Sequence, residues 1–358
     1  MNKKLIFPIL IIFIIYISCS NKQDKIIGVK IYESNSNYKE LVSEWKTIGI
    51  NTAFISKELA ANKVFRNELK KQDINTFIIC PVFQNPEVLK TDSSLYAITN
   101  KGNVAKDDWV EFVCPSRKVY RNKQVNNILS YIKDYQPDGI SIDFIRHFVF
   151  WEMIYADKSP ESFENTCYCD SCTKEFALQE SISIPDTCIS IVQKAQFLAQ
   201  NHLASWNNFR CELIVSMVKE ISEKAKKINP AIKINVHVVP WRDEDFEGAN
   251  INVAGQDIKE IAQYADYISP MCYSQMLKRD DKWISSVVSN MDSKAPNKIL
   301  PSIQVFPYYV EEKFTPEDFR KCIHEALTNP SQGVVFWSWP LFEKDQVRKE
   351  MAKEVVKK

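Results

Sequence analysis

The stretch Pro137–Trp151, PDGISIDFIRHFVFW, combines a turn, an apolar strand and an isolated acid. Asp138 and Gly139 form a turn pair, and the apolar run that follows contains one carboxylate, Asp143. A carboxylate in an otherwise buried β-branched strand is costly unless the protein uses it. The stretch therefore predicts a buried strand whose end carries a functional acid.

Seven further apolar runs alternate with helical patterns along the chain. We expect the eight strands at 26–32, 51–56, 75–83, 139–145, 232–239, 267–273, 299–306 and 333–339. Strands that alternate with helices predict a parallel sheet, and eight such units predict an α/β fold of the (β/α)8 TIM-barrel type. The main alternative is an open doubly wound sheet, which normally has a glycine-rich phosphate loop after an early strand. The chain has only 7 Gly and no such loop.

Two long excursions interrupt the alternation. Residues 84–108 have no strong period and predict a loop over one end of the fold. Residues 147–186 hold a cysteine cluster and precede a long helix, 187–227, that we expect to break near Asn207. We therefore expect one barrel domain over 26–358, with a cysteine-containing insert at about 147–186.

The first residues resemble a bacterial lipoprotein leader. A basic start is followed by the apolar run 5–17, which is short for a membrane span, and then by Ile17-Ser18-Cys19-Ser20. This resembles a lipobox, although Tyr16 stands where leucine is usual. The resemblance implies a signal peptide over 1–18, a lipidated Cys19 and a tether over 19–25. Ser20 after the cysteine implies the outer membrane within the cell envelope. The alternative is an uncleaved anchor helix, and both interpretations place the barrel outside the cytoplasm.

The overall composition is that of a globular protein with a balanced charge. Lysine and arginine total 46 and the acids total 45, a net charge of +1 that argues against nucleic acid as a partner. Aromatic residues are plentiful, with 8 Trp, 14 Tyr and 20 Phe. Core packing accounts for most of them, but some could stack on sugar rings.

The carboxyl ends of the predicted strands carry acids, amides and aromatic residues, the set that sugar binding requires. Because barrel enzymes place their chemistry at these ends, we expect Asp143 to be the central carboxylate of an active site. Glycosidic bond hydrolysis uses two carboxyl groups, and Asp245 is our favoured partner over Glu152 and Glu87. The expected substrate-binding residues are Arg146, His147, His237, Trp241, Tyr273, Gln304 and Trp337.

Each of these residues also has a purely structural interpretation. Asp143 could pair with Arg146, and Asp245 could belong to a solvated acidic loop. His237 could be a satisfied polar group of the core, and Trp337 could fill the barrel interior.

Three motifs resemble a known group of barrels: DGISIDFIRH at 138–147, ISPMCYSQM at 268–276 and GVVFWSW at 333–339. They are similar to those of uncharacterised bacterial (β/α)8 barrels classed as glycoside hydrolases, with distantly chitinase-like strand motifs. In chitinase-type enzymes a catalytic glutamate follows the last aspartate of this strand by two residues. Here Ile145 stands at that position, so the chitinase mechanism does not carry over.

The resemblance and the strand-end residues together predict a glycoside hydrolase that acts on an oligo- or polysaccharide outside the cytoplasm. No cofactor is expected for this catalysis. The alternative is a non-catalytic carbohydrate-binding lipoprotein on the same barrel, which the missing glutamate at position 145 favours.

The ten cysteines include one cluster of close spacing. Cys167, Cys169 and Cys172 form a C-x-C-x-x-C motif, which could bind a structural zinc ion with a fourth ligand. An oxidising compartment would instead permit disulfides, and the sequence leaves both alternatives open. We expect isolated buried thiols elsewhere, at Cys80, Cys114, Cys272 and Cys322.

Overall fold

The computed structural model describes residues 25–34 and 36–357. Its main sheet has eight strands, all parallel, in the order β8-β7-β6-β3-β2-β1-β10-β9. These are β1 Ile26–Ile31, β2 Thr52–Ile55, β3 Asn75–Pro81, β6 Gly139–Asp143, β7 Lys233–Val238, β8 Tyr267–Pro270, β9 Ser302–Gln304 and β10 Gly333–Trp337. Two single parallel bridges, Ile268 to Ile299 and Met271 to Ser302, link the edges at β8 and β9. The predicted (β/α)8 barrel is therefore confirmed, with a seam at β8 and β9.

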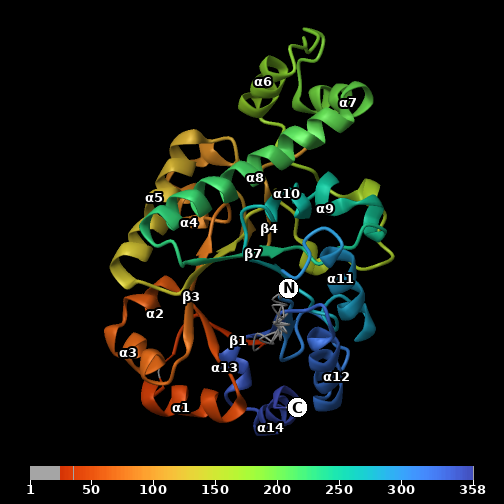
Figure 1. The fold of residues 1–358 in the computed structure, drawn as a ribbon. Coiled ribbons are helices and arrows are strands. Elements are labelled where there is room, and N and C mark those ends of the chain that lie inside the picture. Colours follow the sequence, from red (N-terminus) through yellow and green to blue (C-terminus); the bar gives the residue numbers. More distant parts are fainter. Residues whose placement is uncertain (1–24, 35, 358) are drawn as a thin grey trace, which may run out of the picture.

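Helices surround the sheet (Figure 1). Those of the barrel are α1 Tyr38–Ile48, α2 Lys57–Ala61, α3 Lys63–Lys71, α5 Lys118–Tyr135, α8 Leu203–Ile228, α9 Ala249–Asn252, α10 Ile258–Ile261, α11 Lys282–Asp292, α12 Pro316–Leu327, α13 Trp339–Phe342 and α14 Gln346–Val356. Local sequence fixes several ends. Asn37 caps the start of α1, Gly49 ends it at φ 104°, and Thr315 with Asp318 forms a capping box on α12. None of the helices in the described ranges is long and apolar enough to cross a membrane.

The two excursions both follow carboxyl ends of strands. The first contains α4 Pro86–Thr91, the short helix η1 Ser93–Leu95 and the antiparallel pair β4 Lys106–Asp107 and β5 Val110–Glu111. The second contains the short helices η2 Trp151–Met153 and η3 Pro160–Ser162, then α6 Asp170–Gln179 and α7 Ile191–Asn201. Figure 1 shows α6 and α7 projecting from the barrel. The long helix predicted over 187–227 breaks at His202, between α7 and α8, and not near Asn207.

The barrel interior changes from apolar to polar toward the carboxyl ends. A small core of Phe54, Phe77, Ile79, Leu300 and Val335 fills the part of the barrel interior farther from the carboxyl ends of the strands. Gly139 is required there, because a Cβ atom would lie 2.2 Å from the Phe77 ring. Further along the strands the buried interior residues are polar, and they include Lys30, Ser141, Asn235, His237, Ser269 and Ser302.

Candidate active site

A pocket of about 280 Å³ lies at the carboxyl ends of the barrel strands. Its volume lies just below the range of about 300–1,000 Å³ that is usual for small-molecule sites. Four charged residues line it together with aromatic side chains and one methionine: Lys30, Tyr32, Trp109, Asp143, Phe144, Arg146, Trp151, Glu152, Met271, Tyr273, Tyr308, Tyr309 and Trp337. The pocket therefore combines two acids and two cations with an aromatic wall.

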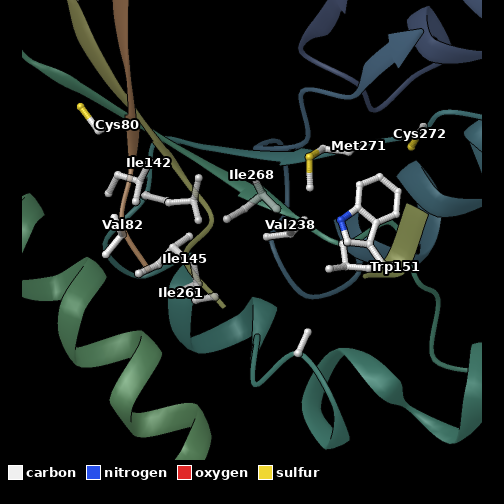
Figure 2. Close-up of a cluster of buried hydrophobic side chains, with 14 of the residues drawn as sticks. Cys80, Val82, Ile142, Ile145, Trp151, Val238, Ile261, Ile268, Met271 and Cys272 are labelled. Atoms are coloured by element: carbon white, nitrogen blue, oxygen red, sulfur yellow. The ribbon is translucent and has the colours of Figure 1, made fainter. Parts of the chain in front are cut away.

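Asp143 is the last residue of β6 and is only 7% exposed. The backbone N–H of Phe144 donates a 2.7 Å hydrogen bond to its Oδ1 atom. Phe144 has a φ of 47°, so the chain turns sharply directly after the strand. This turn sends Ile145 into the outer core beside Ile142 and Val82 (Figure 2). The position of the chitinase glutamate thus faces away from the pocket.

Glu152 is the second carboxylate of the pocket. It lies in η2, is 8% exposed, and its Oε2 atom is buried without a hydrogen-bond partner. Burial raises the pKa of Glu152 to about 7, which the charge of Arg146 only partly opposes and that of Asp143 reinforces. At neutral pH the side chain is therefore divided between its acid and its carboxylate form.

Lys30 projects from β1 into the pocket floor and is 1% exposed. Its Nζ atom lies 3.5 Å from His237 Nδ1 and 3.4 Å from Tyr273 Oη, both long for hydrogen bonds. Burial lowers the pKa of Lys30 to about 8, against the opposing effect of Asp143. Since lysine only donates, His237 Nδ1 accepts, and His237 Nε2 then donates to Ser141 Oγ at 2.8 Å. Lys30 thus contacts a buried network of polar side chains.

Arg146 is the second cation, 2% exposed. Its guanidinium carbon lies 4.7 Å from the centroid of the Phe112 ring, and Nη1 donates to the carbonyl of His147 at 3.2 Å. Its Nη2 atom is buried and has no hydrogen-bond partner in the described part of the chain. Burial lowers the pKa of Arg146 to about 10, which the charges of Glu152 and Asp143 oppose. The side chain remains a cation with a free donor.

Aromatic rings form the remaining wall. Tyr273 and Trp337 stack with centroids 4.5 Å apart, and Tyr308 lies 4.8 Å from Trp337 on the centroid distance. On the other side, Trp109 Nε1 donates a 2.7 Å hydrogen bond to Tyr309 Oη. These contacts fix the orientation of the rings, so the pocket offers preformed flat surfaces.

The structure brings together some of the residues predicted for the site. Asp143, Arg146, Tyr273 and Trp337 line the pocket, and His237 lies beneath it against Lys30. Burial and the nearby Lys30 charge lower the pKa of His237 to about 3, so this ring is neutral. Its contact with a substrate could only be indirect, through Lys30.

Asp245, the expected second carboxylate, lies outside the pocket. It forms ion pairs of 3.0 Å with Arg242 and 3.1 Å with Arg279. Burial raises its pKa, but the hydrogen bonds from Arg242 outweigh this and hold the pKa below the usual value. Asp245 therefore anchors the loop after β7 as a paired carboxylate.

Three other predicted substrate-binding residues also point elsewhere. His147 is fully buried, and its Nε2 atom donates to the Arg210 carbonyl at 3.1 Å. Trp241 stacks on Phe163 with centroids 6.1 Å apart. Gln304 donates to Gln275 Oε1 at 2.9 Å, and its own Oε1 accepts from a backbone N–H. Structural contacts occupy Trp241 and Gln304, and His147, whose Nδ1 atom is buried without a hydrogen-bond partner in the described part of the chain, does not line the pocket.

Lys30 was not among the residues predicted for the site, and Glu152 was placed behind Asp245, whereas the structure places both Lys30 and Glu152 in the pocket lining. Lys30 had a recognisable signal, because a lysine within the apolar run IIGVKIY is as unusual as an aspartate within GISIDF. Glu152 had no comparable signal in the sequence, because this residue lies nine positions beyond Asp143 in an irregular segment whose path no periodicity predicts.

The cysteine cluster has four members. The Sγ atoms of Cys114, Cys167, Cys169 and Cys172 all lie within 4.8 Å of one another, and all four residues are buried. The expectation that Cys114 is an isolated thiol was therefore wrong: the turn after β5 brings it to the insert. Its Sγ lies 3.4 Å from that of Cys172 and 3.7 Å from that of Cys169. Four sulfurs around one zinc ion, with Zn–S bonds of about 2.3 Å, would be separated by about 3.8 Å, so the donor set fits zinc.

Comparisons with known proteins agree on the fold. No family model and no curated protein sequence matches this chain. Among solved structures, the glycoside hydrolase domain of PgaB (BpsB) from Bordetella bronchiseptica superposes with a TM-score of 0.70 at 10% identity, covering 93% of this chain and 98% of that domain. A beta-galactosidase from the psychrophilic Marinomonas ef1 gives 0.68 at 10% identity, covering 93% of this chain and 59% of the other. An alpha-L-fucosidase from Paenibacillus thiaminolyticus gives 0.57 at 12% identity, covering 93% and 48%. The chain thus spans about three fifths of the beta-galactosidase and shares its barrel fold with glycoside hydrolases.

Proposed function

We propose that the protein is a glycoside hydrolase that acts on an oligo- or polysaccharide. The observation that carries this proposal is that Asp143 and Glu152 both line one aromatic pocket at the carboxyl ends of the barrel strands, where barrel enzymes have their active sites. The glycosidase names of the structural neighbours support the same class.

The two carboxyl groups would have different catalytic roles because their surroundings differ. Glu152 is protonated in a large fraction of molecules at neutral pH, so it serves as the general acid that protonates the leaving glycosidic oxygen. Asp143 interacts favourably with the charges of Lys30 and Arg146 and serves as nucleophile or base. Trp337 is already stacked on Tyr273 and close to Tyr308, so the exposed rings of Trp109 and Tyr309, which also line the pocket, provide the surfaces on which a sugar can stack.

The test is a panel of glycans incubated with the wild type and with Asp143→Asn, with the product anomer followed by NMR. We expect cleavage by the wild type and a loss of several orders of magnitude in the variant, with an unchanged circular dichroism spectrum. A non-catalytic sugar-binding protein, the alternative that Ile145 favours, would bind glycans with and without Asp143→Asn and cleave none.

We further propose that Cys114, Cys167, Cys169 and Cys172 hold a structural zinc ion. The donor set is all thiolate, it leaves no open position for a water, and it lies apart from the residues that line the pocket. Zinc would supply a cross-link between the first excursion and the insert.

The cell-envelope location remains a proposal. The predicted leader and the lipid-bearing Cys19 lie outside the described residues. Labelling of the intact protein with radioactive palmitate, lost in Cys19→Ala, tests the anchor, and membrane fractionation tests the outer-membrane assignment.

A further inference from the structure

The four charged side chains of the pocket lie close to one another without direct pairing. Within the described residues, no ion pair of 4.0 Å or less involves Lys30, Asp143, Arg146 or Glu152. Arg146 Nη2 and Glu152 Oε2 are both buried and have no hydrogen-bond partner. Buried polar atoms are normally satisfied, and an unpaired buried charge is costly. Atoms of this kind around a pocket indicate that a ligand completes their contacts.

The pocket has one positive charge more than catalysis requires. When Glu152 carries its proton as the general acid, Asp143 is the only anion among the four, facing the cations Lys30 and Arg146. One cation is enough to balance Asp143. The charge of the second cation is then not balanced. Because the site is buried and its dielectric constant is low, this charge favours a ligand with a negative charge.

Both cations also have N–H groups that make no short hydrogen bond within the described part of the protein. Arg146 donates from Nη1 to the His147 carbonyl, and its guanidinium group lies over the Phe112 ring. Its Nη2 atom is buried beside the pocket and has no partner among the described residues. Lys30 has three N–H bonds but only two long contacts, to His237 and Tyr273. Guanidinium groups bind carboxylates and sulfates through charge-assisted hydrogen bonds that are about twice as strong as neutral ones.

We propose that the sugar unit bound in this pocket carries an anionic substituent, a ring carboxylate or a sulfate ester, that Arg146 and Lys30 recognise. The inference rests on the proposed glycosidase function and adds the substrate class. The volume of about 280 Å³ suits a single sugar unit, so the charge must lie on the unit that enters the pocket and not on a distant part of the chain.

The test compares matched acidic and neutral sugars by the quenching of tryptophan fluorescence, because Trp109, Trp151 and Trp337 all line the pocket. The acidic probes are the methyl glycosides of glucuronate, galacturonate and glucose 6-sulfate, and the neutral probes are those of glucose and galactose, in both anomers. We expect at least one acidic sugar to bind tenfold or more tightly than its neutral partner. The uronate and sulfate arms show which anion the site takes.

Variants assign the preference to the two cations. We expect Arg146→Met and Lys30→Met each to reduce the ratio of acidic to neutral affinity at least fivefold. Lys39→Met, which removes an exposed lysine from α1, should leave the ratio unchanged and controls for net charge. Far-ultraviolet circular dichroism checks that the variants fold, and the wild-type comparison stands even where one of them does not.

The outcomes separate this inference from the proposed function. Equal or tighter binding of the neutral sugars overturns the inference, and cleavage of neutral 4-nitrophenyl glycosides would then leave the glycosidase proposal intact. Preferential binding of acidic sugars without cleavage of their 4-nitrophenyl glycosides or of any glycan supports the inference and counts against the glycosidase. Binding of no sugar at all overturns both.

Discussion

Glu152 and Asp143 share a pocket, but their surroundings give them different chemistry. Burial dominates at Glu152 and raises its pKa to about 7, whereas Asp143 lies within the field of two cations. An acid with a raised pKa keeps its catalytic proton below that value and loses it as the pH rises through it. The alkaline side of the pH dependence therefore reports on Glu152 near pH 7 and, about one pH unit higher, on Lys30.

The first prediction concerns the alkaline limb of activity. We expect kcat/KM of the wild type to fall as the pH rises through about 7, because Glu152 loses its proton. Glu152→Gln should lower kcat/KM by about 10²–10⁴-fold and move the remaining fall up to the pKa of Lys30, about 8. Asp245→Asn, which removes a carboxylate outside the pocket, should retain the limb. An unchanged limb in Glu152→Gln would assign the acid to another group.

The second prediction concerns Ile145, the residue at the position of the chitinase glutamate. Its side chain is fully buried in the outer core. Ile145→Glu would place an unpaired carboxylate there, and we expect a loss of more than about 3 kcal/mol in the free energy of unfolding and no gain of activity. Ile145→Val should cost about 0.5–1.5 kcal/mol. Urea denaturation measures both, and a stable, more active glutamate variant would refute this placement.

At the scale of elements, the cysteine cluster joins two excursions that build the pocket wall. In the structure the first excursion runs from the end of β3 to the start of α5 and carries both Trp109 and Cys114. The other three cysteines belong to the insert, which carries Glu152. Apart from α6 and α7, the helices and strands of the two excursions are short. A metal cross-link between them would therefore stabilise the relative positions of the wall and the acid.

The third prediction follows from this cross-link. We expect the purified protein to contain about one zinc ion per chain by plasma mass spectrometry, and Cys114→Ser to lose most of it. Cys188→Ser, which changes a half-buried cysteine outside the cluster, should retain the metal. Chelation should lower the melting temperature and weaken sugar binding. Stoichiometric disulfides among these four cysteines, detected by mass spectrometry without reduction, would exclude the zinc site.

For the molecule as a whole, the hydrophobic periodicity of the sequence was enough to predict the barrel but not enough to predict the active site. Runs such as IIGVKIY and GVVFWSW identify buried strands because both faces of a parallel barrel strand are covered. The carboxyl ends of the strands were predicted one to three residues too far along the chain, because turns such as that at Phe144 lead apolar residues away from the sheet. Asp143 was identified because it interrupts such a run. Glu152 and Cys114 reach their sites through irregular loops, whose paths depend on tertiary contacts that local sequence does not specify.

The last prediction concerns the seam between β8 and β9, where the barrel closes through single bridges and not through a continuous ladder. The N–H of Leu300 donates to the Ile268 carbonyl at 2.8 Å, but few neighbouring bonds support it. Because local opening starts where fewest bonds must break, we expect amide hydrogens at 267–271 and 299–304 to exchange faster than those of β1 and β6. Hydrogen-exchange mass spectrometry measures this.

The seam also adjoins the pocket through Met271 and Tyr273, which directly follow β8. A sugar bound against these residues should stabilise the closed barrel and slow exchange at the seam more than at β2, which contributes no residue to the pocket lining. Uniform protection of all eight strands in the free protein would contradict the predicted weak seam. Slower exchange at β2 alone on sugar addition would place the binding site elsewhere.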